Sequence, residues 1–438
     1  MQADLVIRGA KVVDPAEAFE RPADVYVRDG VILDIAPPDE ALPAAETLDA
    51  DGLVLCPGLV DIHVHLRQPG GEHKETIATG TRAALAGGFT TVACMPNTDP
   101  PLDRPEHLRL LLDVLRRDAA CEVHPIAAAI LDRDPERLSD FAALKEAGAV
   151  AISDDAMPLQ DQGVMQRALL AAEHASLTFI AHPELEHVGG DGVCGDPEVA
   201  AELSIPYADP AREAEGIRAW QQAAATLPSR GRAALHIAHL SSAQAIAAFE
   251  EFSESSHLRR LSAETCPHYF TLTADALRTA GPDAKMNPPL RTAADVEAAK
   301  EALRRGLIKV IATDHAPHAS HEKARGLLAA PAGIVGLETA LGLVLEYLVR
   351  PGILTLSQAL SKMTWHPAAA LGIEAGRLAV GMPANLTLID TDATWTVDAR
   401  RFYSKSRNTP FNGWQLRGRA VMVFLRGRLV MRDGEVLV

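Results

Sequence analysis

Cysteine and positive charge are both scarce in this chain. Its 438 residues include 5 cysteines, and none of them forms a C-x-x-C pair, so we interpret them as reduced, buried thiols and not as a disulfide framework. The 42 lysines and arginines are outnumbered by 58 acidic residues, and the net charge of -16 argues against a surface built to bind nucleic acid. No segment approaches 18 uninterrupted apolar residues, so neither a membrane span nor a secretion signal is indicated, and we expect a soluble, cytoplasmic protein.

The two ends of the chain have the pattern of short strands joined by tight turns. Dipeptides suited to turns stand between apolar runs at Asp29-Gly30, Arg426-Gly427 and Asp433-Gly434. Neither end is large enough to build a good core by itself. We therefore predict that residues 1–56 and 373–438 pack together as one small β-sandwich domain.

Residues 57–372 have a different pattern, in which apolar runs alternate with helical segments. Near-continuously apolar strands separated by helices are typical of a parallel sheet that is covered on both faces. The candidate strands are residues 59–65, 90–95, 122–130, 149–154, 177–182, 234–239, 261–266 and 309–314, and the clearest helices are residues 75–85, 105–117, 135–147, 211–226 and 293–305. Eight such units in about 300 residues predict an α/β fold, a (β/α)8 TIM barrel.

Histidines and aspartates gather at the ends of these strands. His63 and His65 are two residues apart, so their side chains would share one face of a strand. In a TIM barrel the carboxyl ends of all strands meet at one mouth, where further candidates would join this pair: Asp154, Asp155, His182, His239 and Asp314. Imidazole and carboxylate groups are suitable ligands for zinc and for other divalent first-row metals. Six ligands are too many for one tetrahedral zinc, so we expect a carboxylate-bridged pair of ions, suited to hydrolysis of an amide-like bond or its reversal.

The chain resembles the amidohydrolase superfamily, and within it the dihydroorotases of the shorter bacterial type, over nearly its whole length. The resemblance rests on the segments HVHLRQPGGEHKET, AGGFTTVACMPNT, ISDDA, FIAHPE, LHIAHLSS, ETCPHYFTLT, KMNPPLR, TDHAPH and GIVGLET. It implies two zinc ions and places ligands on His63, His65, His182, His239 and Asp314. Many relatives bridge the ions with a carboxylated lysine, but no lysine ends the fourth strand here. The family spacing favours Asp155 over Asp154 as the bridge.

The same resemblance implies how the substrate is held. Asp314 would bind a metal and also act as general base and acid, returning a proton to the ring nitrogen as it leaves. Arg67, two residues beyond His65 on an extended chain, would offer a paired fork to the carboxylate of dihydroorotate. The implied substrate-binding residues are His65, Arg67, Asn97, Asn287, His318, Ala332 and Gly333, while His315 is expected to be structural.

Three functions are open at this point. The first is dihydroorotase activity, the reversible hydrolysis of (S)-dihydroorotate to N-carbamoyl-L-aspartate in pyrimidine (UMP) biosynthesis. The second is a neighbouring cyclic-amide hydrolase, such as an allantoinase or dihydropyrimidinase; Arg67 and Asn97 argue against it, since those substrates lack the carboxylate. The third is an inactive scaffold for aspartate carbamoyltransferase, which the six filled ligand positions disfavour.

The family also suggests partners and a moving loop. Its members commonly form homodimers, which we expect here, and aspartate carbamoyltransferase is a candidate partner. We interpret residues 319–331 as a lid over the pocket. Gln68, Ala156 and Pro183 depart from the usual pattern of the family and bear on fine specificity.

Two further histidines, His236 and His268, lie in or just after predicted strands. His236 lies three residues before His239, so strand alternation places it on the opposite face, where we expect it to pack against a helix. His268 could approach the site from the seventh strand, but it is the weaker candidate.

Overall fold

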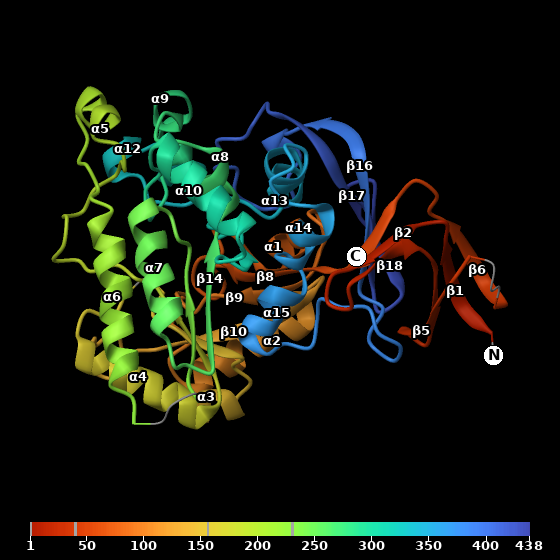
Figure 1. The fold of residues 1–438 in the computed structure, drawn as a ribbon, viewed down its shortest axis with the longest axis horizontal. Helices are drawn as coiled ribbons and strands as arrows, with labels where there is room; N and C mark the ends of the chain where they lie inside the picture. The colour runs from red at the N-terminus through yellow and green to blue at the C-terminus, as the bar shows by residue number, and fades with distance from the viewer. Residues whose placement is uncertain (1, 39–41, 156, 229–231) are drawn as a thin grey trace.

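The computed structural model describes residues 2–38, 42–155, 157–228 and 232–438. Ala156, one of the departures from the family pattern, lies outside these residues. Figure 1 shows a barrel on the left and a smaller β-domain on the right. Within the described residues no helix is both long and apolar enough to cross a membrane. The 5 cysteines are free and buried, as expected.

Eight parallel strands form the barrel in the order of the chain. They are β8 (Leu59–Val64), β9 (Phe89–Cys94), β10 (Glu122–Ala128), β11 (Ala151–Ser153), β12 (Thr178–Ala181), β13 (Ala234–Ile237), β14 (Arg260–Thr265) and β15 (Val310–Ile311). The first and last strands meet where the His65 amide donates to the His315 carbonyl oxygen at 2.8 Å. The predicted TIM barrel is confirmed, and each predicted strand overlaps an observed one.

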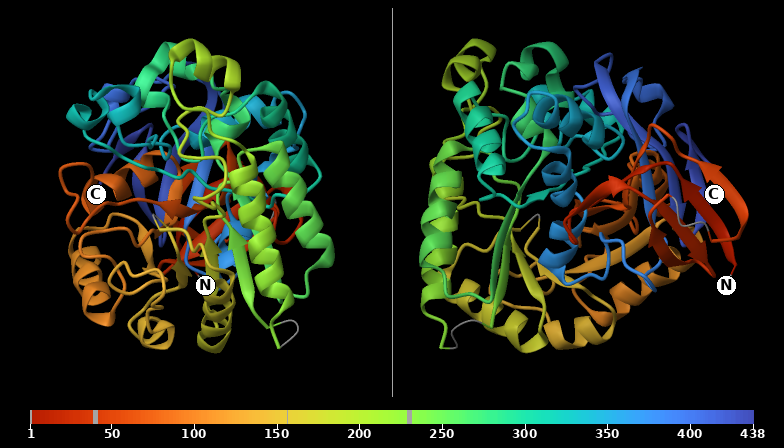
Figure 2. Two further views of the ribbon diagram at one scale, coloured as in Figure 1. Left: turned by 90° about the vertical axis from the view of Figure 1, so that its left-hand side faces the viewer. Right: turned by 45° about the vertical axis from the view of Figure 1, so that its right-hand side comes forward.

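Helices follow the strands and cover the outside of the barrel (Figure 2). The longer ones are α1 (Ile77–Ala86), α2 (Pro105–Asp118), α4 (Gln162–Ala175), α6 (Ala211–Ala225), α7 (Ala243–Ser255) and α10 (Ala293–Arg304). The helix predicted from residue 135 begins later, as α3 (Phe141–Glu146). Asp140 explains this start, because its side chain accepts a hydrogen bond from the Ala143 amide and caps the helix.

Shorter helices lie mostly in the second half of the chain. They are α5 (Pro197–Leu203), α8 (Pro267–Thr271), α9 (Ala276–Ala280), α11 (Ser320–Lys323), α12 (Gly326–Ala329), α13 (Ala340–Val344), α14 (Leu356–Ser361) and α15 (Trp365–Leu371). Figure 1 shows α5, α9 and α12 together at the top of the barrel.

The interior of the barrel is apolar at its amino-terminal end. Inward side chains such as Val60, Ile126 and Ile180 pack against α15, and the Thr178 hydroxyl donates to the Ala370 carbonyl oxygen at 2.8 Å. This packing closes the lower mouth and excludes water from it. The candidate ligand residues lie at the opposite, carboxyl-terminal mouth.

The two ends of the chain form the small β-domain, as predicted. One sheet has the order β5-β4-β1-β6, from β1 (Ala3–Arg8), β4 (Asp24–Arg28), β5 (Val31–Ala36) and β6 (Ala44–Asp49). The other has the order β19-β18-β17-β16-β7-β2-β3, from β2 (Lys11–Asp14), β3 (Phe19–Pro22), β7 (Val54–Pro57), β16 (Leu386–Thr396), β17 (Gln415–Leu425), β18 (Arg428–Arg432) and β19 (Glu435–Val436). β7 pairs with β16, which joins segments more than 300 residues apart. The boundaries after residues 56 and 372 stay predictions.

The hairpin turns expected in this domain are confirmed. Asp29-Gly30 connects β4 to β5, Arg426-Gly427 connects β17 to β18, and Asp433-Gly434 connects β18 to β19. Both residues of each pair have a positive φ, between 49° and 84°. Two-residue hairpins of this kind need such a backbone, which glycine adopts at little cost.

Phe179 anchors the strand that leads to the site. Its ring is fully buried between those of Trp220, 5.0 Å away, and Phe141, 6.4 Å away. We expect Phe179→Ala to lower the free energy of unfolding by about 3–5 kcal/mol, because the lost ring leaves a cavity in close-packed surroundings. Urea unfolding of the variant measures this, with Val380→Ala as the exposed control. A loss below 1 kcal/mol at Phe179 would contradict the packing argument.

Candidate active site

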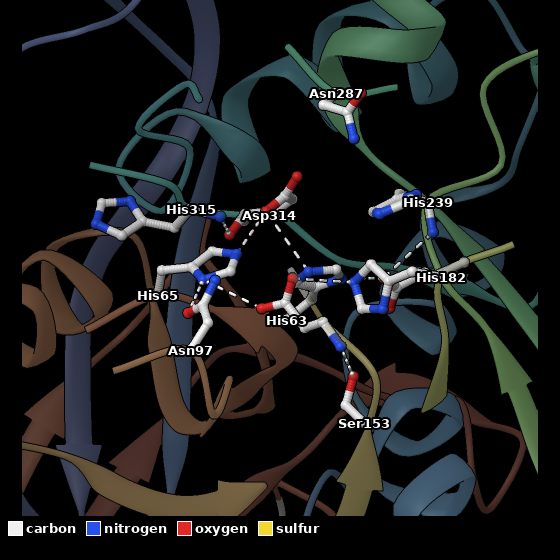
Figure 3. A network of polar contacts seen from close by, with 12 residues as sticks. His63, His65, Asn97, Ser153, His182, His239, Asn287, Asp314 and His315 are labelled. Atoms are coloured by element: carbon white, nitrogen blue, oxygen red, sulfur yellow. Dashed lines mark hydrogen bonds and ion pairs between the residues drawn. The ribbon is translucent and has the colours of Figure 1, made fainter. Parts of the chain in front are cut away.

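The predicted ligand residues lie together at the carboxyl ends of the barrel strands (Figure 3). They are His63 on β8, His65 just after it, and Asp155, His182, His239 and Asp314 in the turns that follow β11, β12, β13 and β15. Ligand atoms of His63, His182 and His239 all lie within 4.8 Å of one another, and so do those of His63, His65 and Asp314. His63 belongs to both groups and therefore stands at the centre of the cluster.

Asp314 lies against both His63 and His65. Its Oδ1 lies 3.1 Å from Nε2 of His65 and 3.5 Å from Nε2 of His63. Burial by itself would raise the pKa of this carboxyl, but the charge of His63 and the hydrogen bond with His65 outweigh burial and hold the pKa of Asp314 well below its ordinary value. The group is therefore ionised at neutral pH, in the form that binds a cation or accepts a proton.

A buried carboxylate holds the other ring nitrogen of His63. Glu264, on β14, places Oε1 2.5 Å from Nδ1 of His63. Burial disfavours the protonated ring, but the negative charges of Glu264 and Asp314 outweigh it and raise the pKa of His63 to about 10. A proton and a metal ion compete for the same imidazole lone pair, so these surroundings also favour a divalent cation.

Two more imidazoles are held in the same way. Nδ1 of His65 lies 2.9 Å from Oδ1 of Asn97, and Nδ1 of His182 lies 3.2 Å from Oδ1 of Asp154. The same Asp154 oxygen accepts a hydrogen bond from the His182 amide at 2.8 Å. A donor bond at Nδ1 leaves the lone pair on Nε2, which in each ring faces the cluster.

Asp155 lies between the two halves of the cluster. Its Oδ1 is 3.4 Å from Nε2 of His182, and its Oδ2 is 3.5 Å from Nδ1 of His65. Burial would raise the pKa of Asp155, but the charges of His65 and His182 outweigh burial and lower it. Of the two neighbouring aspartates, Asp155 thus faces the cluster while Asp154 contacts His182 from behind.

All of the predicted site residues except Asp154 line one cavity of about 330 Å³. Arg67 is half-buried in its wall, where Nε donates to the Pro317 carbonyl oxygen at 3.2 Å. The chain at Arg67 is not extended as expected, because its φ is 59°. Asp314 and His239 also have positive φ, of 46° and 34°. Such backbone costs about 1–3 kcal/mol per residue and persists only where surrounding contacts hold it, which is common at functional sites.

His318 and the Ala332-Gly333 pair form the wall beside Arg67. Nε2 of His318 donates to the Ala332 carbonyl oxygen at 2.7 Å, and Nη2 of Arg67 lies 3.4 Å from the same nitrogen. Burial and the charge of Arg67 lower the pKa of His318 to about 2, so this ring is neutral. Gly333 donates its amide to the Lys285 carbonyl oxygen, and a Cβ there would lie 2.5 Å from the Ala316 carbonyl oxygen.

On the opposite wall, Asn287 is oriented by a residue that the sequence reasoning missed. Its Nδ2 donates to both oxygens of Glu184, at 3.0 and 3.1 Å. Glu184 follows Pro183 in the FIAHPE segment, and its Oε2 lies 3.7 Å from Nε of Arg212, which also lines the cavity. The sequence signal that could have identified Glu184 is its position two residues after the predicted ligand His182.

The expectation for His236 was wrong. Its ring faces the barrel interior, where Nδ1 lies 2.8 Å from Oγ of Ser262 and Nε2 lies 3.1 Å from Oε2 of Glu264. Alternation failed because β13 ends at Ile237 and the chain then turns, so that His239 no longer follows the pleat of the strand.

His315 and His268 do not line the cavity. Figure 3 shows the His315 ring pointing away from the other imidazoles. Its Nε2 lies 3.3 Å from Oε2 of Glu75, and Glu75 also accepts hydrogen bonds from the Ser404 hydroxyl and the Lys405 amide. His315 therefore joins the barrel to the C-terminal segment.

The loop proposed as a lid, residues 319–331, contains α11 and α12. Lys323 is buried in it and donates to the carbonyl oxygens of Pro331 and Gly333, each at 3.0 Å. Leu328 at its tip is 61% exposed. The loop thus adjoins the cavity wall through Gly333, and its closure over a ligand stays a prediction.

Comparison with known proteins identifies the family. Residues 52–207 match the model of the family described as Dihydro-orotase-like. The dihydroorotase of Geobacter metallireducens is 42% identical over 432 residues, covering 98% of this chain and 100% of that protein. The dihydroorotase of Syntrophotalea carbinolica is 43% identical over 434 residues, covering 98% and 99%. The chain belongs to the dihydroorotase family.

Solved structures of cyclic-amide hydrolases share the fold of this dihydroorotase family member. L-hydantoinase (dihydropyrimidinase) from Arthrobacter aurescens superposes with a TM-score of 0.88 at 25% identity, covering 100% of this chain and 98% of that one. D-hydantoinase (dihydropyrimidinase) from Thermus sp. gives 0.83 at 25% identity, covering 99% and 96%. This chain therefore shares with these hydrolytic enzymes a fold in which a barrel is joined to a small β-domain.

The cluster of this dihydroorotase family member fits divalent metal. Nε2 of His182, Nδ1 of His239 and Oδ2 of Asp155 are buried and have no hydrogen-bond partner among the described residues. Such atoms are rare in folded proteins, and ligation is one way to satisfy them. Three such atoms beside His63 and Asp314 make a donor set of imidazole nitrogens and carboxylate oxygens, which suits Zn²⁺ and neighbouring first-row ions.

Divalent metal should stabilise the protein. A ligand that binds only the folded state at 100 times its Kd adds about 2.7 kcal/mol to the free energy of unfolding. We expect Zn²⁺, Mn²⁺ or Co²⁺ to produce a stabilisation of this size in the chelator-treated protein, measured by urea unfolding. His63→Asn should abolish most of it, whereas His174→Asn, an exposed control on α4, should retain it. Equal responses of the two variants would refute the metal site.

Proposed function

We propose that this protein is a dihydroorotase that interconverts (S)-dihydroorotate and N-carbamoyl-L-aspartate in pyrimidine biosynthesis. The observation that carries the proposal is the position of Arg67. Its guanidinium lines the same cavity as the histidine and aspartate cluster, so a ring amide at the cluster can place an exocyclic carboxylate against Arg67. The names of the relatives at 42–43% identity support the same activity.

The proposed cofactor is a pair of zinc ions. Their ligands would be His63, His65, Asp155, His182, His239 and Asp314, with Asp155 as the bridge. The position of Asp155 between His65 and His182 supports this choice, as does the contact of Asp154 with the far nitrogen of His182. Two such ions polarise a carbonyl and make water a stronger nucleophile at neutral pH.

Asp314 is the proposed proton carrier. Its carboxylate is ionised at neutral pH, lies against His63 and His65, and lines the cavity that would hold the scissile amide. It would take a proton as water adds to the ring carbonyl and return it to the ring nitrogen as the C–N bond breaks. In the reverse direction it would remove the proton from the carbamoyl nitrogen.

The substrate contacts divide between the two walls of the cavity. Arg67 and Asn97 would hold the carboxylate, His318 would contact the substrate beside them, and the Ala332-Gly333 backbone would lie along the ring. On the other wall, Glu184 accepts an N–H of the Asn287 amide group, shared between its two oxygens. Oδ1 of Asn287 is then the atom left to accept a hydrogen bond from a ring N–H.

A second candidate function is hydrolysis of a carboxylate-free ring, as in the hydantoinases that share the fold. Arg67 argues against it, since its half-buried guanidinium, which donates to the Pro317 carbonyl oxygen through Nε, would face an uncharged ring with no carboxylate to pair with its charge. The homodimer, the association with aspartate carbamoyltransferase and the cytoplasmic location also remain predictions of this proposal.

Substrate preference tests the proposal directly. Zinc-loaded protein should turn over L-dihydroorotate in strong preference to dihydrouracil, hydantoin and allantoin at equal concentration, because only the first offers a carboxylate to Arg67. Arg67→Ala should lower kcat/KM for dihydroorotate by roughly 10- to 150-fold, which corresponds to about 1.5–3 kcal/mol for charge-assisted hydrogen bonds.

The matched control for this test is Arg67→Lys, which keeps the charge and loses the fork. It should fall between wild type and Arg67→Ala on dihydroorotate. Activity confined to a carboxylate-free ring would move the protein to the second function. An equal loss by Arg67→Ala on dihydroorotate and dihydrouracil would undercut the carboxylate contact, and silence on all four substrates would favour a scaffold.

Asp314→Asn should abolish turnover and leave the fold intact. Asparagine keeps the size of the side chain but cannot accept the proton, so we expect kcat to fall by at least about 10²- to 10⁴-fold. Steady-state kinetics and circular dichroism of the variant measure the two parts of this prediction. Near-normal kcat in folded, zinc-loaded Asp314→Asn would refute the role as proton carrier.

A further inference from the structure

Glu264 is a buried carboxylate that touches the centre of the histidine cluster from below. It lies on β14, is 1% exposed and does not line the cavity. A charge in such surroundings is costly unless it is paired and hydrogen-bonded. Three contacts of Glu264 provide this pairing and hydrogen bonding.

The first contact fixes the ring of His63. Oε1 of Glu264 is 2.5 Å from Nδ1 of His63, on the side away from Asp314. A carboxylate can only accept this hydrogen bond, so Nδ1 carries the proton and the lone pair available to a metal lies on Nε2. Because His63 is the residue shared by both groups of ligand atoms, its orientation affects both.

The second contact reaches the backbone of another proposed ligand. The His239 amide lies 3.4 Å from the same Oε1, at a residue whose φ is 34°. A histidine in left-handed backbone needs its surroundings to hold it there. Glu264 thus contacts the imidazole ring of His63 and the main chain of His239.

The third contact holds Glu264 itself in place. Its Oε2 is 3.1 Å from Nε2 of His236, and Nδ1 of His236 is 2.8 Å from Oγ of Ser262, two residues before Glu264 on β14. His236 therefore joins β13 to β14 inside the barrel. This chain of contacts orients both carboxylate oxygens and leaves the side chain little freedom.

In a similar pair elsewhere in the molecule, the carboxylate contacts none of the proposed ligands. Glu75 is as buried as Glu264, and its Oε2 lies 3.3 Å from Nε2 of His315. His315 is outside both groups of ligand atoms. The two carboxylate–histidine pairs thus resemble each other in burial and chemistry and differ in whether the histidine faces the proposed metals.

We propose that Glu264 is a positioning residue for the metal centre, which fixes His63 as an Nε2 ligand and holds the backbone of His239 for the second ion. The proposal rests on the proposed function only in requiring that divalent metal binds at this cluster. It extends that function to a residue outside the cavity, and it explains why His236 faces inward.

The test is the zinc affinity of chelator-treated protein, measured by competition with a chromophoric zinc chelator. Glu264→Gln keeps the shape of the side chain but loses its charge, and should weaken zinc binding by about 10- to 100-fold, the usual effect of removing a partner of a ligating histidine. Glu75→Gln, the matched control, should bind zinc within about threefold of wild type, because it alters a similar pair away from the metals.

The outcomes separate this inference from the proposed function. If wild type binds no zinc, the metal centre itself fails. If wild type binds zinc and Glu264→Gln binds it equally well, or if Glu75→Gln loses as much affinity, the positioning role is overturned. Should Glu264→Gln not fold, ¹⁵N-histidine NMR of zinc-loaded wild type still decides, with the His63 signals assigned by their loss in His63→Asn. A proton on Nδ1 of His63 is expected, and an unprotonated Nδ1 would overturn the proposal.

Discussion

The structure depends on the pairing of buried charges at one mouth of the barrel. Histidines and carboxylates from five strands are removed from water there, and each ionised group would be costly alone. Asp314 against His63 and His65, and Asp155 between His65 and His182, offset that cost. The pairing is incomplete, since buried atoms of His182, His239 and Asp155 find no hydrogen-bond partner in the described part of the chain, and these are the atoms that a divalent ion would use.

The remainder of the barrel makes this arrangement possible. The amino-terminal half of the barrel is packed with aliphatic side chains and closed by α15, which holds the strands in place below the polar mouth. The mouth itself departs from regular geometry, with left-handed backbone at Arg67, His239 and Asp314. A rigid apolar base can hold such strained residues, because close packing resists the relaxation that would relieve them.

A second layer of contacts decides which atoms face the cavity. Glu264, Asn97 and Asp154 each contact Nδ1 of a cluster histidine, and Glu184 accepts a hydrogen bond from the amide group of Asn287. Hydrogen bonding at one ring nitrogen selects the tautomer and so determines what the other nitrogen can do. Under the proposed function, Glu264 and Asp154, which do not line the cavity, would thus help to set the metal affinity.

The sequence by itself determined the alternation of strands and helices, the hairpin turns and the strand ends at which polar residues gather. These features depend on local pattern: apolar runs, glycine pairs and the spacing of His63 and His65 are readable within a few residues. The family resemblance then supplied the expected roles. Tertiary structure alone decided that Glu264 lies under His63, 201 residues away in the chain, that His236 faces inward, and that Arg67 turns out of the extended form. The physical reason is that strand pairing around a closed barrel and the turns after each strand set these contacts, and neither leaves a signal in the local sequence.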